Sequence, residues 1–215
     1  MKIGIFGGSF DPVHNGHVEL SQAFMSTLSL DRVLVIPAYV SPFKIKNRAA
    51  LPLQRLEMCR LAFSELPNTE VSDIEIVRQG ASFTYQTLQT LALQCPDSEL
   101  FLITGADSFL TLQNWREPKE IFRLATVCVI PRNDDREDVL KKHAEYLHEL
   151  GAKTEILGAE VMTVSSTEIR RRVQSGESIK GLVPEKVEEY IYENGLYLPQ
   201  DEIQDTDGCV SDDKE

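Results

Sequence analysis

The sequence lacks the marks of several protein classes. Its four cysteines, Cys59, Cys95, Cys128 and Cys209, form no Cys-x-x-Cys pair, so they indicate reduced, packed thiols rather than a metal or redox motif. No apolar run approaches the roughly 18–20 residues that a membrane span needs. The N-terminus leads straight into an apolar strand pattern, without the regions of a signal peptide. We therefore expect a cytoplasmic protein that has no membrane partner.

Positive charge is also scarce. The chain has 22 Lys and Arg against 34 Asp and Glu, a net charge of -12. Half of that charge lies in residues 199–215, which hold seven acids and one lysine. The remaining body is only mildly acidic, which disfavours non-specific binding to nucleic acid. We expect one domain over residues 1–198, followed by an acidic, disordered tail over residues 199–215 that is too polar to dock.

What the sequence does contain is an alternation of short apolar, β-branched runs with longer amphipathic stretches. This alternation predicts βαβ units in an α/β fold with a doubly wound, mostly parallel sheet. Continuous apolar strands fit a sheet that is covered on both faces. The predicted strands are Ile3–Phe6, Val33–Ile36, Leu100–Thr104, Val127–Ile130 and Thr154–Leu157. The predicted helices are Val18–Leu28, Leu53–Glu65, Thr84–Gln94 and Asp138–Leu150.

The last third of the chain predicts two consecutive helices with no strand between them. Ser165 and Glu168 have the spacing of a capping box at the start of the first helix, and Gly176 marks its end. Pro184 begins the second helix, which an Asn-Gly dipeptide closes. We expect these helices to form a small C-terminal cap at the edge of the sheet.

The loop after the first strand, GGSFDPVHNGH at residues 7–17, has the composition of a phosphate site. Gly7 and Gly8 predict a tight turn that approaches a ligand closely. The helix that follows offers free N–H groups to an anion. His14 and His17 lie three residues apart, on one face of a helical turn, where both can donate to phosphate oxygens. The loop matches neither the dinucleotide Gly-x-Gly-x-x-Gly pattern nor the Walker pattern.

A second candidate phosphate site is SSTEIR, residues 165–170. A Ser-Ser-Thr run at a helix start presents hydroxyls and free N–H groups together. Arg170 follows one turn later, near the positive end of the helix, which favours an anionic ligand for it. Taken alone, the segment fits a surface helix with solvated arginines equally well.

Together, the two motifs resemble the paired signature of the adenylyl- and cytidylyltransferase superfamily. Residues 1–198 are similar to the bacterial nicotinate-nucleotide adenylyltransferases within it. The similarity includes the sequences IP at 36–37, PFK at 42–44, SFT at 82–84, GAD at 105–107, NW at 114–115 and PR at 131–132. It implies a Rossmann-like fold and transfer of AMP from ATP to nicotinate mononucleotide, giving deamido-NAD and pyrophosphate.

The resemblance also implies a role for each site residue. The catalytic residues that bind the transferred and outgoing phosphates are His14, His17 and Arg170. The ATP-binding residues are Gly7, Gly8, Ser9, Phe10, Gly105, Asp107, Ser166 and Thr167. The acceptor-binding residues are Lys44, Thr84, Thr87, Trp115 and Arg132. No carboxylate cluster for a resident metal is visible in the sequence, so Mg²⁺ is expected to arrive on the ATP phosphates.

Three alternatives remain open at this stage. A sister transferase would use another acceptor such as phosphopantetheine, although those chains are shorter and carry Thr-x-x-His. Nicotinamide mononucleotide could replace the nicotinate form, and a regulatory module could bind the nucleotides without turnover. Phe43 stands where many relatives have histidine, so no role of that histidine carries over. The sequence is compatible with both a monomer and a homo-oligomer.

Overall fold

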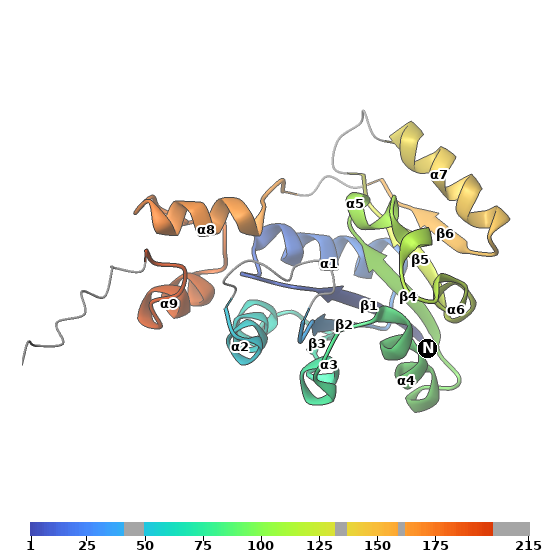
Figure 1. Cartoon of the computed structure of the whole chain (residues 1–215), viewed down its shortest axis with the longest axis horizontal. Coiled ribbons are helices and arrows are strands. Elements are labelled where there is room, and N and C mark those ends of the chain that lie inside the picture. The colour runs from blue at the N-terminus through green and yellow to red at the C-terminus, as the bar shows by residue number, and fades with distance from the viewer. Residues whose placement is uncertain (41–49, 132–136, 159–161, 200–215) are drawn as a thin grey trace, which may run out of the picture.

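The computed structural model describes residues 1–40, 50–131, 137–158 and 162–199. Its strands are β1 (Lys2–Gly8), β2 (Arg32–Pro37), β3 (Thr69–Val71), β4 (Glu99–Thr104), β5 (Ala125–Val129) and β6 (Lys153–Ile156). They form one six-stranded sheet in the order β3-β2-β1-β4-β5-β6, and all neighbouring strands are parallel. Figure 1 shows this sheet between helices. The predicted Rossmann-like, doubly wound fold is confirmed.

The strand order reverses direction between β1 and β4. From β1 the chain winds outwards to β2 and β3, then returns to place β4 on the other side of β1. In a parallel sheet, the crevice at such a reversal, beyond the carboxyl ends of the strands, is where ligands bind. The loops after β1 and β4 are therefore the first place to look for a site.

Helices cover both faces of the sheet, as the apolar strands predicted. The side chains of Ile3 and Ile5 enter one core, and that of Phe6 enters the other. On the Phe6 side lie α1 (Asn15–Thr27) and α2 (Pro52–Phe63). On the other side lie α4 (Thr84–Gln94), α6 (Pro118–Leu124) and α7 (Glu137–Glu149).

All predicted strands and helices are present, with ends that differ by a few residues. The structure adds short elements that the patterns do not reveal. These are β3, α3 (Ile74–Arg78), α5 (Ala106–Phe109), α6 and the 3-10 helix η1 (Leu112–Asn114). They are too short for an apolar period to develop, since a helical stripe needs at least two turns to be recognised.

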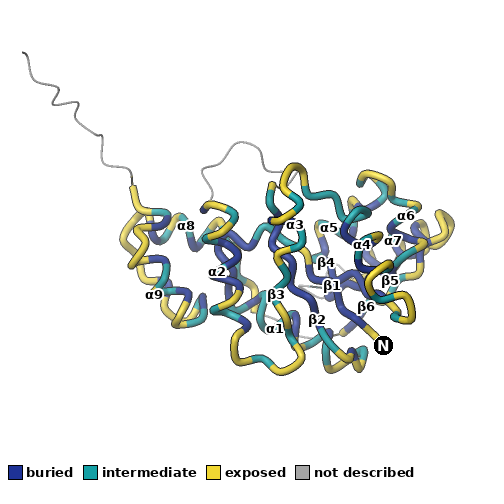
Figure 2. The backbone as a smooth tube through the Cα atoms, turned by 90° about the horizontal axis from the view of Figure 1, so that it is seen from below, coloured by how far each residue is buried: buried dark blue, intermediate teal, exposed yellow. Residues whose placement is uncertain are grey.

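The C-terminal cap consists of α8 (Ser166–Gln174) and α9 (Glu185–Glu193). It lies at the end of the molecule opposite β6 and α7 (Figures 1 and 2). Helix α9 packs against α2, which itself covers β2 and β3. Asn15, at the start of α1, donates its backbone N–H to the carbonyl of Leu182 at 2.9 Å and its side-chain amide to that of Gly181 at 2.8 Å. The cap is thus tied to the beginning of the first helix.

The three cysteines within the described ranges are free thiols, as predicted. Burial raises the pKa of Cys59, and it raises the pKa of Cys128 to about 12, so both thiols stay protonated and unreactive at neutral pH. Cys209 lies outside the described residues. Among the residues that the structure describes, no helix combines the length and apolar character required to cross a membrane.

Candidate active site

A cavity of about 510 Å³ lies at the carboxyl ends of β1, β2 and β4, where the strand order reverses. Its volume falls within the range of small-ligand sites. The strands bring together segments that are far apart in the sequence. Nine of the predicted site residues line this cavity: Gly7, Gly8, Ser9, His17, Thr84, Thr87, Gly105, Asp107 and Trp115.

The first loop differs from prediction in how it turns. Gly7 and Gly8 do not make the turn, because they are the last two residues of β1. The residue with left-handed backbone is Phe10, whose φ is 47°. Gly8 matters for a different reason: a Cβ atom there would lie 3.0 Å from the Phe10 ring, which would have to shift by a few tenths of an ångström. This close packing lets Phe10 turn back into the core, where it is 2% exposed.

His17 projects from the first turn of α1 into the cavity. The backbone N–H of His14 donates to Nδ1 of His17 at 3.2 Å. Since a backbone N–H can only donate, Nδ1 must accept, and a neutral His17 carries its proton on Nε2. His17 therefore presents a fixed N–H donor.

The rings around His17 hold it in place. The His14 ring stacks on it with centroids 3.6 Å apart, and the Phe10 ring meets it edge-on at 5.0 Å. His14 itself is only 4% exposed. The predicted role of His14 on the outgoing phosphates stays a prediction, whereas its backbone and ring orient His17 in the structure.

Other residues of the cavity lining come from the loop after β4 and from α4. Gly105 and Asp107 lie at the start of α5, directly after β4. Thr84 is the first residue of α4, and Trp115 follows η1 with its side chain partly exposed. Figure 1 shows α5 beside the end of β4. A flat indole and a helix start thus share one cavity with His17.

The start of α8 reaches the same loop from the C-terminal side. Ser166 donates its hydroxyl to the carbonyl of Pro12 at 2.9 Å, and Nη1 of Arg170 donates to the carbonyl of Asp11 at 2.6 Å. Nη2 of Arg170 donates to the Thr167 hydroxyl at 3.3 Å. The two phosphate motifs are therefore in contact, although Ser166, Thr167 and Arg170 are not among the residues that line the cavity.

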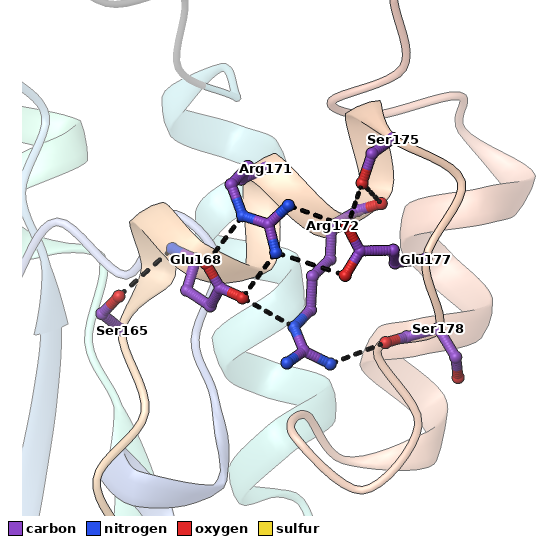
Figure 3. Close-up of polar contacts among 7 residues, drawn as sticks. All are labelled: Ser165, Glu168, Arg171, Arg172, Ser175, Glu177 and Ser178. Atoms are coloured by element: carbon purple, nitrogen blue, oxygen red, sulfur yellow. Dashed lines mark hydrogen bonds and ion pairs between the residues drawn. The ribbon is translucent and has the colours of Figure 1, made fainter.

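The capping box predicted at α8 forms only in part. Ser165 accepts the Glu168 N–H at 3.1 Å, as a cap should. The Glu168 carboxylate instead binds Arg171 and Arg172, which lower its pKa to about 2 (Figure 3). Charge-assisted bonds to two guanidinium groups outcompete a single bond to a backbone N–H. Arg171 also binds Glu177 at 2.7 Å, so Arg170 is the arginine of this run that faces the first loop.

A buried polar network that the sequence did not reveal fixes the first loop. Arg55 of α2 is 5% exposed, and its guanidinium donates to the carbonyl of Ser9 at 2.6 Å and to that of Ala38 at 2.6 Å. The Asp11 carboxylate accepts the Tyr197 hydroxyl at 2.7 Å. Burial lowers the pKa of Arg55 and Asp11 counteracts it, whereas burial and Asp11 together raise the pKa of Tyr197. Tyr197 thus retains the proton it donates.

We expect Tyr197→Phe to destabilise the protein, because buried Asp11 loses a donor. The loss of a hydrogen bond to a charged group costs about 1.5–3 kcal/mol, which corresponds to a fall in melting temperature of roughly 3–10 °C for a chain of this size. Tyr192→Phe is the control, since Tyr192 is 45% exposed. Thermal unfolding of both variants measures this difference. The melting temperature of a chain that ends at Pro199, measured in the same way, tests the domain boundary. Equal melting temperatures for Tyr197→Phe and wild type would contradict the role of this network.

Two predicted site residues, Lys44 and Arg132, lie outside the described residues, as do Phe43 and the tail from residue 200. No group of three or more His, Cys, Asp or Glu side chains able to hold a metal occurs in the part of the chain that is described.

Comparisons with known proteins bear on the family and the fold of this chain. Residues 5–172 match the family described as cytidylyltransferase-like. A curated relative from Roseiflexus, named a probable nicotinate-nucleotide adenylyltransferase, is 42% identical over 195 residues, which cover 91% of this chain and 97% of the relative. A relative of the same name from Clostridium beijerinckii is 37% identical over 201 residues, covering 91% and 98%.

Among solved structures, the Plasmodium falciparum nicotinic acid mononucleotide adenylyltransferase complexed with NaAD is similar to this chain with a TM-score of 0.74. The match covers 91% of this chain and 97% of that one at 17% identity. At this level of identity the likeness supports the fold.

Proposed function

The chain belongs to the cytidylyltransferase-like family, and we propose that it transfers AMP from ATP to nicotinate mononucleotide, with deamido-NAD and pyrophosphate as products. The observation that carries the proposal is the composition of a single cavity. The loop that carries His17, residues Gly105 and Asp107, and the pair Thr84 and Trp115 all line this cavity, which lies at the switch point of the sheet. The curated relatives align with about nine-tenths of this chain, and their names state this activity.

The reaction requires little covalent chemistry from the protein. An oxygen of the acceptor phosphate attacks the α-phosphorus of ATP, a new P–O bond forms, and the bond from the α-phosphorus to the leaving pyrophosphate breaks. Because the attacking group is already an anion, no general base is needed. Positioning two polyanions and stabilising the charge on the α-phosphate are what remain.

His17 supplies that stabilisation in our proposal. Its Nε2–H, fixed by the bond to Nδ1, donates to an α-phosphate oxygen as negative charge spreads over it. ATP lies along Gly8 and Ser9, with its ribose towards Gly105 and Asp107, all of which line the cavity. Arg170 and Thr167 bind the outgoing phosphates from α8, as positively charged and hydroxyl groups close to the same loop.

Mg²⁺ is proposed to enter with ATP rather than to occupy a resident site. Mg²⁺ commonly keeps several waters and uses substrate phosphate oxygens, and the described residues offer no cluster of three ligands. When bound, the ion neutralises part of the phosphate charge. We place the reaction in the cytoplasm and the end of the domain near residue 198.

The acceptor is proposed to lie against Trp115 and the start of α4. The indole offers a flat surface to the pyridine ring. Thr84 offers a hydroxyl and, as the first residue of α4, a backbone N–H without an intrahelical acceptor. A carboxylate gains more from such donors than a neutral amide does, about 1.5–3 kcal/mol per bond against about 1.

We therefore expect kcat/KM to favour nicotinate mononucleotide over nicotinamide mononucleotide by at least about tenfold. This ratio corresponds to a free-energy difference of about 1.4 kcal/mol. Release of pyrophosphate is measured with ATP, Mg²⁺ and three acceptors: the acid, the amide and phosphopantetheine. In the same assay Trp115→Ala raises the KM of the acceptor more than that of ATP. Equal use of acid and amide would contradict the nicotinate assignment, and turnover with phosphopantetheine alone would favour the sister transferase.

A further inference from the structure

A buried carboxylate belongs to the wall that the acceptor is proposed to contact. Glu75 of α3 is 7% exposed, yet it lines the same cavity as Thr84 and Trp115. A carboxylate in this position repels an acidic acceptor and can accept the N–H groups of an amide. On its own, Glu75 would therefore favour nicotinamide mononucleotide as the acceptor, whereas the relatives are named for the nicotinate form.

Glu75 is held by a short chain of polar contacts. The Thr87 hydroxyl donates to Oε1 of Glu75 at 2.6 Å, and Nη2 of Arg78 donates to the Thr87 oxygen at 3.1 Å. The Arg78 guanidinium lies 3.8 Å from Oε1 of Glu75. The Thr87 hydroxyl thus links Glu75 to Arg78. Its predicted role as an acceptor-binding residue stays a prediction.

The charge of Arg78 has no other carboxylate within ion-pair distance among the residues in the structure. Its Nε and Nη1 atoms are buried and have no hydrogen-bond partner in the described ranges. An incompletely satisfied guanidinium is costly to bury, and here it lies beside the single carboxylate that it neutralises. Glu75 lines the cavity and Arg78 does not, so the guanidinium acts on the cavity wall through its effect on Glu75.

We propose that Arg78 cancels the charge of Glu75 and that this pair determines acceptor selectivity for the acid over the amide. The inference rests on the proposed function, since it assumes that the acceptor ring lies at this wall. Charges in a partly buried site interact over several ångströms, at an effective dielectric constant of about 20. The net charge of the pair is therefore sensed by a carboxylate on the ring.

Three variants vary that net charge without touching the first loop. Arg78→Met leaves a negative wall, Glu75→Gln leaves a positive one, and the double variant returns it to neutral. The quantity to measure is the ratio of kcat/KM for the acid to kcat/KM for the amide. We expect the ratio to fall about three- to thirtyfold in Arg78→Met, to rise by a similar factor in Glu75→Gln, and to return towards wild type in the double variant.

A matched pair serves as the control. Glu120 and Arg123 lie three residues apart on α6, as Glu75 and Arg78 do on α3. Glu120 also accepts a hydrogen bond at 2.9 Å from Gln89 of α4, the helix that carries Thr87. This pair does not line the cavity. Glu120→Gln and Arg123→Met should leave the acid-to-amide ratio unchanged.

The ratio separates selectivity from damage to the structure. Loss of packing lowers turnover with both acceptors and leaves their ratio unmoved, which would overturn the proposal. If Arg78→Met does not fold, Glu75→Gln and Arg78→Lys still test it, because the first should raise the ratio and the second should preserve it. If the wild-type enzyme does not prefer the acid, the proposed function fails. If it does prefer the acid and the single variants shift the ratio in the same direction, only this inference fails.

Discussion

Replacing His17 by alanine should lower kcat by roughly two to three powers of ten, the effect of removing one donor that acts on the transition state. The reason is geometric: the backbone N–H of His14 fixes the His17 tautomer, so that Nε2–H is already oriented before substrate arrives. Binding of ATP should weaken much less, because in the proposed site other groups of the loop also contact the nucleotide. Steady-state kinetics give kcat, and titration of the enzyme with ATP gives the dissociation constant.

His148→Ala is the control for this experiment. His148 lies on α7 and contacts the Thr154 hydroxyl at 2.7 Å, away from the cavity. It should retain wild-type kinetics. Near wild-type turnover of His17→Ala would contradict its assignment as the phosphate donor. An equal loss of ATP affinity and turnover would make it a binding residue instead.

Much of the fold follows from the sequence because its strands are short, continuous runs of apolar, β-branched residues. A stretch such as Val33–Ile36 is typical of a strand that is buried on both faces, and the structure buries it there. The edge strand β3 escapes detection because Thr69–Val71 has three residues and is only partly buried. Pairing with β2 stabilises this segment, so its strand depends on a neighbour that is distant in sequence.

The sequence predicts less of the site than of the fold, and the reason differs from one residue to the next. Arg55 does leave a signal, since it interrupts the apolar stripe of α2 formed with Met58 and Cys59, and a buried arginine needs partners. Glu75 leaves none, because it reaches Thr87 only through the packing of α3 on α4. The sequence predicts the turn at the glycines and not at Phe10, because nothing local indicates that a phenylalanine adopts a positive φ.

The run of three arginines shows what the structure adds to a prediction. The sequence singles out Arg170 by its position near the start of the helix and by the family resemblance. The structure places its guanidinium against the first loop and pairs Arg171 and Arg172 with Glu168 (Figure 3). We expect Arg170→Ala to lower kcat/KM for ATP about a hundredfold. Two charge-assisted bonds to the outgoing phosphates, at about 1.5 kcal/mol each, account for this loss.

Arg171→Ala is the matched control, one residue further along the same helix. Its side chain is 53% exposed and pairs with Glu168 and Glu177, and exposed pairs contribute about 0–1 kcal/mol to stability. We expect it to keep kcat/KM within about twofold of wild type, a difference of roughly 0.4 kcal/mol. Arg170→Lys keeps the charge but not the planar fork, so it should recover only part of the loss. If Arg170→Ala and Arg171→Ala behaved alike, the contact between α8 and the first loop would be structural, and the outgoing phosphates would have to be bound by other groups.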